Sequence, residues 1–213
     1  MPKRVDHEQR RREIIEAAWR LVARGGFAAA TMREIAAEAG FANGGLKYYF
    51  DSKDDLLIAA FQHTFYRVNE RAALSIGDRT GLEAIRLLCL EMLPLDDERS
   101  VEARVAVAFW DRAASSKAMR KIHADSFAIW RTWMENELQT ARRNGRLNTA
   151  VSDRQIVDEF LAVTAGLRIM PILEAGAAEP LDQVELIDAL VARLEAGDPA
   201  HVQPRTAAAT PTA

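Results

Sequence analysis

The pattern of apolar and polar positions predicts a helical hairpin near the N-terminus. Over residues 31–39 apolar side chains recur at intervals of three and four, and Thr31 followed by Glu34 has the spacing of a capping box that begins a helix. Gly40 can adopt the left-handed conformation that a sharp reversal requires. A second helix is expected to follow, with its inner side formed by Ala42, Leu46 and Phe50. The pattern therefore predicts a helix-turn-helix.

The same periodicity predicts helices along the rest of the chain, about nine in all, and no strands. The run from Val105 to Trp110 is six apolar residues long and could by itself be a buried strand. Because no other stretch offers a partner strand, we interpret it as a buried helix. The remaining helices are expected up to Gly25-Gly26-Phe27, from Ser52 to about Ser75, and over roughly Leu82–Leu93, Val101–Ala114, Ser116–Asn144, Ser152–Pro171 and Val184–Leu194.

The outer side of the hairpin carries residues suited to DNA. Asn43 can form paired hydrogen bonds with an adenine edge, and Lys47 can donate to guanine or to a phosphate. Glycines cost about 1 kcal/mol each in a helix interior, but they let a backbone approach a duplex closely. Phosphate contacts are expected from the hydroxyls of Tyr48 and Tyr49 and from the ammonium group of Lys53. The alternative is a helical hairpin whose outer face is merely polar.

The full hairpin string resembles a known family. It reads T-x-R-E-I-A-x-x-A-G-F-x-x-G-x-L-x-Y-Y-F-x-S-K-D-x-L, and it resembles the DNA-binding domain of the TetR family of bacterial regulators from about His7 to Leu57. The family pattern implies backbone-positioning roles for Thr31, Arg33, Tyr49 and Lys53, and a reading surface made by Asn43, Gly44, Gly45, Lys47 and Tyr48. Lys47 stands where many members carry a tyrosine.

The resemblance also implies the layout of the whole chain. We expect a helix-turn-helix domain over 1–51, a helical ligand-binding and dimerisation domain over 52–197, and a disordered tail over 198–213, where no apolar pattern is present. The last two helices would pair across a two-fold axis. Their apolar stripes supply the predicted dimer interface, Ile156, Phe160, Val163, Leu167, Ile187, Leu190 and Leu194. The alternative for these stripes is ordinary core.

Charge is distributed unevenly along the chain. The net charge is −3, but residues 1–50 hold nine Lys and Arg against six Asp and Glu. A basic head on an acidic body is typical of a local DNA-binding face. Two interpretations fit the basic residues before the first apolar stripe, a phosphate-tracking arm or a solvated charge run; these residues are Lys3, Arg4, Arg10, Arg11 and Arg12.

Composition argues against membrane and secretory classes. No run of eighteen uncharged apolar residues is present, and the basic N-terminus has no apolar core behind it. A single cysteine, Cys89, excludes an intramolecular disulfide and fits a reducing cytoplasm. We therefore expect a cytoplasmic protein that does not interact with membranes.

The body resembles the choline-sensing betaine-pathway repressors of the same family over roughly Arg104 to Leu173. Aromatic faces together with a carboxylate are what a quaternary ammonium ligand requires. The candidate effector pocket consists of Phe109, Trp110, Trp130 and Trp133, with Glu91, Asp111 and His123 as polar candidates. The alternative is that these aromatic residues are core.

No catalytic motif is present. The sequence has no glycine-rich phosphate loop, no metal-spaced Cys/His set and no nucleophile elbow, and a thiol in an apolar helix is usually inert. We predict a non-enzymatic, ligand-responsive repressor, without metal or cofactor, that binds a pseudo-palindromic double-stranded DNA operator as a homodimer and is released by a small-molecule effector. The alternative is a helical adaptor with a non-functional head.

Overall fold

The computed structural model describes residues 7–42, 44–173 and 180–197. Within these ranges the chain forms eight α-helices and two short 3₁₀ helices and no strand, which confirms the all-α prediction. The elements are α1 (His7–Ala29), α2 (Met32–Glu38), η1 (Gly45–Tyr48), α3 (Lys53–Ile76), α4 (Leu82–Met92), α5 (Asp97–Ser115), α6 (Lys117–Arg143), α7 (Asp153–Ile169), η2 (Met170–Leu173) and α8 (Pro180–Ala196).

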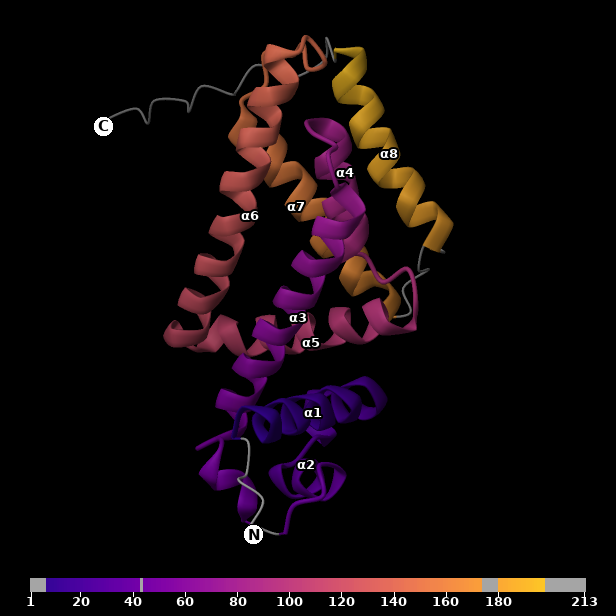
Figure 1. Ribbon diagram of the computed structural model, residues 1–213. Helices are drawn as coiled ribbons and strands as arrows, with labels where there is room; N and C mark the ends of the chain where they lie inside the picture. The colour runs from indigo at the N-terminus through magenta and orange to yellow at the C-terminus, as the bar shows by residue number, and fades with distance from the viewer. Residues whose placement is uncertain (1–6, 43, 174–179, 198–213) are drawn as a thin grey trace, which may run out of the picture.

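A small head is built from α1, α2 and η1 at one end of the molecule (Figure 1). The backbone of α1 breaks at Gly26, where φ is 72°, as the glycine pair in the sequence predicts. Apolar side chains from α1, α2, η1 and the first turns of α3 close the head around one core, which includes Ile14, Ala18, Val22, Ile35, Leu46, Phe50 and Leu56.

Helix α3 runs from the head far into the body and packs in both (Figure 1). Its N-terminus is capped by Ser52, whose Oγ accepts a hydrogen bond from the Asp55 amide at 3.1 Å. Near the start of the helix, Phe61 stacks on Phe109 of α5 with ring centroids 4.0 Å apart. Because one unbroken helix is packed at both ends, a displacement of α3 in the body must move the head.

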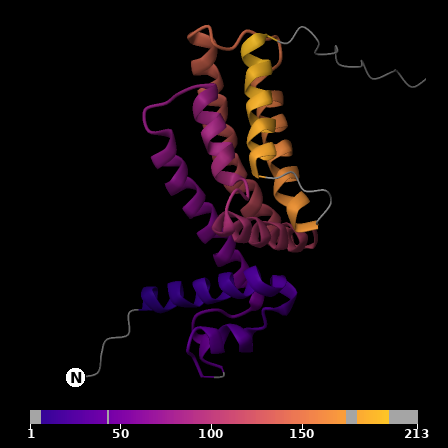
Figure 2. The same cartoon turned by 90° about the vertical axis from the view of Figure 1, so that its right-hand side faces the viewer.

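In the body, α5 lies across the base, and α4, α6, α7 and α8 lie above it (Figure 1). Helices α7 and α8 lie side by side along one side of the body (Figure 2). The core between α3, α4, α6, α7 and α8 contains Leu88, Met134, Leu138, Phe160 and Ile187. Pro171 was expected to kink or end its helix, and it lies in η2 just after α7, so the α-helix ends before it.

Two predicted boundaries are wrong. Helix α5 begins at Asp97 and not at Val101, because Asp96 caps it by accepting a hydrogen bond from the Arg99 amide at 2.8 Å. The second helix of the hairpin is a single 3₁₀ turn that begins at Gly45, and Ala42 is exposed instead of facing inward. The tail over 198–213 lies outside the described residues.

Candidate nucleic-acid interface and ligand cavity

The hairpin is fixed by its cap and its glycines. Thr31 and Glu34 form the predicted capping box: the Thr31 Oγ1 accepts from the Glu34 amide at 3.2 Å, and Glu34 accepts from the Thr31 amide at 2.8 Å. These hydrogen bonds lower the pKa of Glu34. Left-handed backbone at Gly40 (φ 74°) and Gly44 (φ 92°) makes the reversal. Gly44 precedes η1 directly, so this glycine sets where the turn begins.

The predicted DNA-binding residues lie around this turn. Tyr48 is 74% exposed. The side chains of Thr31, Arg33 and Lys47 are also exposed, as is Gly44, whereas Gly45, Tyr49 and Lys53 are half-buried and Asn43 lies outside the described residues. A hollow of about 350 Å³ between α2 and η1 brings Arg33 and Lys47 to one surface, beside Asp51. The structure therefore gathers both basic side chains on the outer face of the hairpin.

The N-terminal arginines do not act alike. Arg10 pairs with Glu13 at 2.9 Å, and Arg12 donates to Gln9 at 2.9 Å, so both are satisfied on the surface of α1. Arg11 instead donates from Nη1 to the Tyr49 carbonyl oxygen at 2.8 Å and covers the Phe50 ring at 4.2 Å. It thereby holds the end of η1. No pattern in the sequence distinguishes Arg11 from its neighbours.

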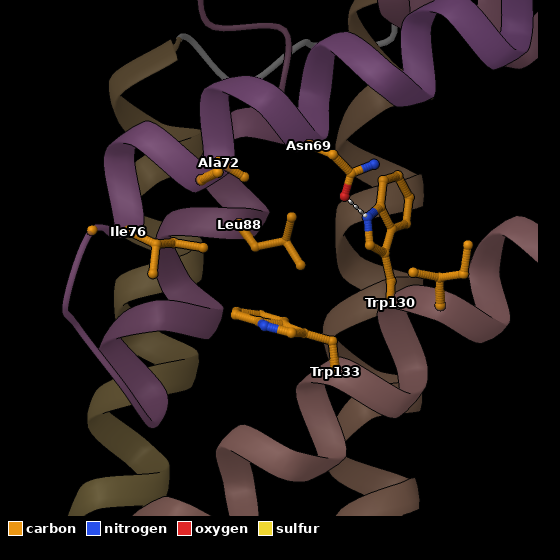
Figure 3. A pocket seen from close by; sticks show the side chains of 9 residues that line it. Asn69, Ala72, Ile76, Leu88, Trp130 and Trp133 are labelled. Carbon is orange, nitrogen blue, oxygen red and sulfur yellow. Dashed lines mark hydrogen bonds between the residues drawn. The ribbon is translucent and has the colours of Figure 1, made fainter.

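A cavity of about 340 Å³ lies in the body between α3, α4 and α6 (Figure 3). Trp133 and Leu88 project into it from two helices, and Ile76 lies on its α3 side (Figure 3). The full lining is Asn69, Ala72, Ala73, Ile76, Gly77, Leu88, Ile129, Trp130 and Trp133. The walls are thus apolar and aromatic.

The single polar side chain of this lining is already used. Asn69 accepts a hydrogen bond from the Trp130 Nε1 at 3.0 Å and donates from Nδ2 to the Phe65 carbonyl oxygen at 2.6 Å. This bridge fixes the Trp130 indole plane against α3. None of the described residues that line the cavity is charged. A ligand there would be held by shape and by aromatic faces.

The helix-turn-helix and the helical body agree with comparisons to known proteins. Residues 14–60 match the model of bacterial regulatory proteins of the tetR family, and residues 81–196 match the BetI-type transcriptional repressor C-terminal domain. The second match covers more than half of the chain. The chain belongs to the TetR family.

Relatives and solved structures place this TetR-family chain among regulators. It is 38% identical over 120 residues to the HTH-type transcriptional regulator PksA of Bacillus subtilis, which covers 56% of this chain and 58% of that protein. Over 194 residues it is 25% identical to the regulator BetI of Brucella anthropi, covering 90% of this chain and 96% of the relative. A regulator from Saccharomonospora viridis, solved in complex with choline, has a TM-score of 0.80 at 22% identity, covering 87% of this chain and 96% of that one.

The predicted effector residues do not form one pocket in this TetR-family body. Trp130 and Trp133 line the cavity. Phe109 is fully buried against Phe61, and Trp110 lies edge-on to His123 with ring centroids 6.2 Å apart. Sequence proximity could not separate these groups, because successive turns of α5 and α6 face different neighbours.

The two predicted carboxylates also lie away from the cavity lining. Glu91 accepts a hydrogen bond from the Arg71 Nε at 3.1 Å and from the Ser75 hydroxyl at 2.7 Å, and it also pairs with Arg99 at 3.5 Å. Asp111 is exposed. Burial lowers the pKa of His123, so the imidazole is neutral at pH 7. None of these groups supplies a negative charge to the cavity.

Most predicted dimer residues belong to the core of their own chain. Leu167 and Leu194 are each 4% exposed, and Leu167 therefore does not point outward as predicted. The buried members are Ile156, Phe160, Leu167, Ile187 and Leu194, whereas Val163 and Leu190 are half-buried. The periodicity of α7 and α8 marked the inward face, because that face also carries the larger apolar side chains.

The outward face of α7 and α8 carries smaller and fewer apolar groups. On α8, Leu186 is 47% exposed, and Ala189 is exposed one turn further on. On α7, Ala162 and Gly166 are exposed at a spacing of four. Small side chains at this spacing allow close approach of another helix. Sequence reasoning missed this stripe because alanine contributes little to an apolar pattern.

The state of the Cys89 thiol and the family to which the chain belongs both argue against an enzyme. Cys89 is completely buried, and burial raises the pKa of its thiol to about 12, so it stays protonated at neutral pH. The relatives named above are transcriptional regulators, and this TetR-family chain is a regulator and not an enzyme. Among the described residues no helix is long and apolar enough to cross a membrane, and no group of acidic, His and Cys side chains could hold a metal.

Proposed function

We propose that the protein is a DNA-binding repressor that binds an operator as a homodimer and dissociates from it when an effector binds in the body. The exposed turn with Lys47 and Tyr48, set on a firmly packed head, supports this proposal most directly. One such turn per chain gives few base contacts, and two heads spaced by about 34–36 Å would read successive major grooves. Such a regulator works on chromosomal DNA, and so in the cytoplasm.

In this proposal the dimer forms through the outward face of α7 and α8. Leu186, Ala189, Ala162 and Gly166 would meet their symmetry mates in an isologous interface. Close approach of two small-residue stripes would bury the Leu186 side chains. The proposed division into a head over 1–51 and a body over 52–197 follows from the same arrangement, with α3 as the link.

The effector is proposed to occupy the cavity between α3, α4 and α6. The cavity touches α3 at Asn69, Ala72 and Ile76, so an occupant would press on the helix that carries the head. It can shift the protein away from DNA only if it binds the released state more tightly. A quaternary ammonium is one candidate because Trp130 and Trp133 offer aromatic faces, and the choline complex of the Saccharomonospora protein favours it.

Replacing Lys47 with alanine is expected to weaken operator binding by about 1–3 kcal/mol while affecting random DNA less. Operators selected from fragmented genomic DNA would be titrated with wild type and variant, and fluorescence anisotropy would report both Kd values. Lys121→Ala, an exposed change on α6, is the control. Equal losses on operator and random DNA would show that Lys47 contacts only phosphate. No selectable operator would favour the helical adaptor.

Replacing Trp133 with leucine is expected to remove most of the stabilisation by choline, because each aromatic face contributes about 0.5–2 kcal/mol to binding of such a cation. Thermal melting with choline, a neutral aromatic alcohol and a fatty acid would be compared in wild type and variant. Trp19→Leu, in the head, controls for the loss of a tryptophan elsewhere. Stabilisation by the neutral or acidic compounds alone would refute the cationic effector.

A further inference from the structure

Arg168 of α7 has a buried guanidinium. Its side chain is 3% exposed. Within the described residues it forms no ion pair, and its guanidinium makes one long hydrogen bond, from Nη2 to the Glu102 main-chain oxygen at 3.5 Å. The Nε–H has no acceptor. A buried charge left in this state is costly, because desolvation is not repaid by a partner.

The carboxylate of Glu102, whose charge acts on Arg168, is already paired with other arginines. Glu102 accepts two hydrogen bonds from Arg71, at 2.8 and 2.6 Å, and lies 3.6 Å from the Arg67 Nε. Burial lowers the pKa of Arg168 to about 10, while the charge of Glu102 acts in the opposite direction. The guanidinium is therefore still charged at pH 7 and has no full counter-charge among the described groups.

A second buried donor without an acceptor belongs to a side chain that Arg168 contacts. The Trp110 Nε1–H is buried and has no acceptor, and the Arg168 guanidinium carbon lies 5.4 Å from the Trp110 ring centre. The two side chains come from α5 and α7, which pack against each other. His123, whose ring meets the Trp110 edge, is held neutral by burial. The surroundings thus offer donors and positive charge, together with an aromatic wall.

We propose that Arg168 and Trp110 form an anion site between α5 and α7, which takes the carboxylate of a small organic acid. The carboxylate would accept from the Arg168 Nε–H and the Trp110 Nε1–H and neutralise the buried guanidinium. Its organic part would lie along the ring row that continues from Trp110 through His123 to Phe127, where the ring centroids are 6.2 and 4.1 Å apart. None of these four residues lines the cavity that contains Trp133.

The first test compares two arginines in the ligand-free protein. Arg168→Met keeps an unbranched apolar stem and removes the unpaired charge, so the melting temperature should be unchanged or higher. Arg142→Met is the matched control, because Arg142 donates to Asp153 at 2.7 Å and to the Thr149 and Val151 carbonyl oxygens at 2.8 and 2.6 Å. This variant should melt lower. A comparable fall in Arg168→Met would show that Arg168 already has its partner, and would overturn the proposal.

The second test determines whether the site binds carboxylates. Acetate, hexanoate and benzoate would be compared with acetamide, hexanamide and benzamide by thermal melting of the full chain at constant ionic strength. At least one carboxylate should raise the melting temperature by several degrees and its amide should not. The rise should vanish in Arg168→Met, shrink in Trp110→Phe and persist in Trp133→Leu. No response to any of the three acids, equal response to acid and amide, or a response that survives in Arg168→Met would each refute the site.

The same variants separate this site from the regulator proposal. Operator binding by Arg168→Met should equal that of wild type, because the substitution leaves the DNA-binding residues unchanged. A wild type that binds an operator but ignores all carboxylates would contradict the anion site alone. A wild type that responds to carboxylates but selects no operator would contradict the proposed repressor alone.

Discussion

Negative charge on the outward face of α8 is expected to yield a monomer that binds operator DNA about 10³-fold more weakly than wild type. The double change is Leu186→Glu with Ala189→Glu. In an isologous dimer each new carboxylate meets its own copy near the two-fold axis, so four buried like charges oppose association. Neither position lies in the core, and the folded chain should persist. Analytical ultracentrifugation and anisotropy would measure the two effects.

The control for this prediction is Leu74→Glu. Leu74 is an apolar residue of α3 that is 85% exposed, and it tests the general effect of a new surface charge. This variant should remain dimeric and bind operator normally. A double variant that sediments as a dimer would place the interface elsewhere. A monomer with undiminished operator affinity would show that pairing is not needed for binding.

Glu102→Gln is expected to lower the free energy of unfolding by about 3 kcal/mol. The buried Glu102 carboxylate receives both Arg71 Nη groups, and this hydrogen bonding raises the pKa of Arg71. A neutral amide would leave Arg67 and Arg71 with less counter-charge, and it would remove a carboxylate whose charge stabilises the buried guanidinium of Arg168. Urea unfolding followed by circular dichroism would measure the change.

Glu98→Gln is the matched control within the same network. Glu98 pairs with Arg67 and Arg71 but is 45% exposed, so its loss should cost less than about 1 kcal/mol. Equal effects of the two substitutions would mean that burial does not distinguish these carboxylates. A larger effect of Glu98→Gln would contradict the assignment of Glu102 as the centre of the network.

The network also bears on how an effector could reach the head. Arg71 and Ser75 face α4 and α5 through Glu91 and Glu102, whereas Ala72 and Ile76 face the cavity. Both faces belong to the same two turns of α3. A ligand that pushes on the cavity face must therefore strain or rearrange the ion pairs on the other face, and stiff packing along α3 would carry the displacement to the head.

The sequence alone determined the features that depend on short spacing. The capping box at Thr31, the reversal at Gly40, the end of α7 at Pro171 and the inertness of Cys89 follow from a few neighbouring residues. They could be predicted because local hydrogen bonds and apolar periodicity act over one or two turns. The TetR-family assignment rested on an equally local string, and the comparisons confirmed it.

Only the tertiary structure decided which distant residues meet. Helical spacing showed that Leu167 and Leu194 share an apolar face, but not that this face turns into its own core and leaves Leu186 outside. It likewise could not separate Trp110 from Trp133, or show that Arg168 meets Trp110 and, among the described residues, pairs with no carboxylate. The reason is physical: periodicity fixes which side of a helix is apolar, whereas the helix that covers that side, and the polar groups left without partners there, depend on how all the helices pack.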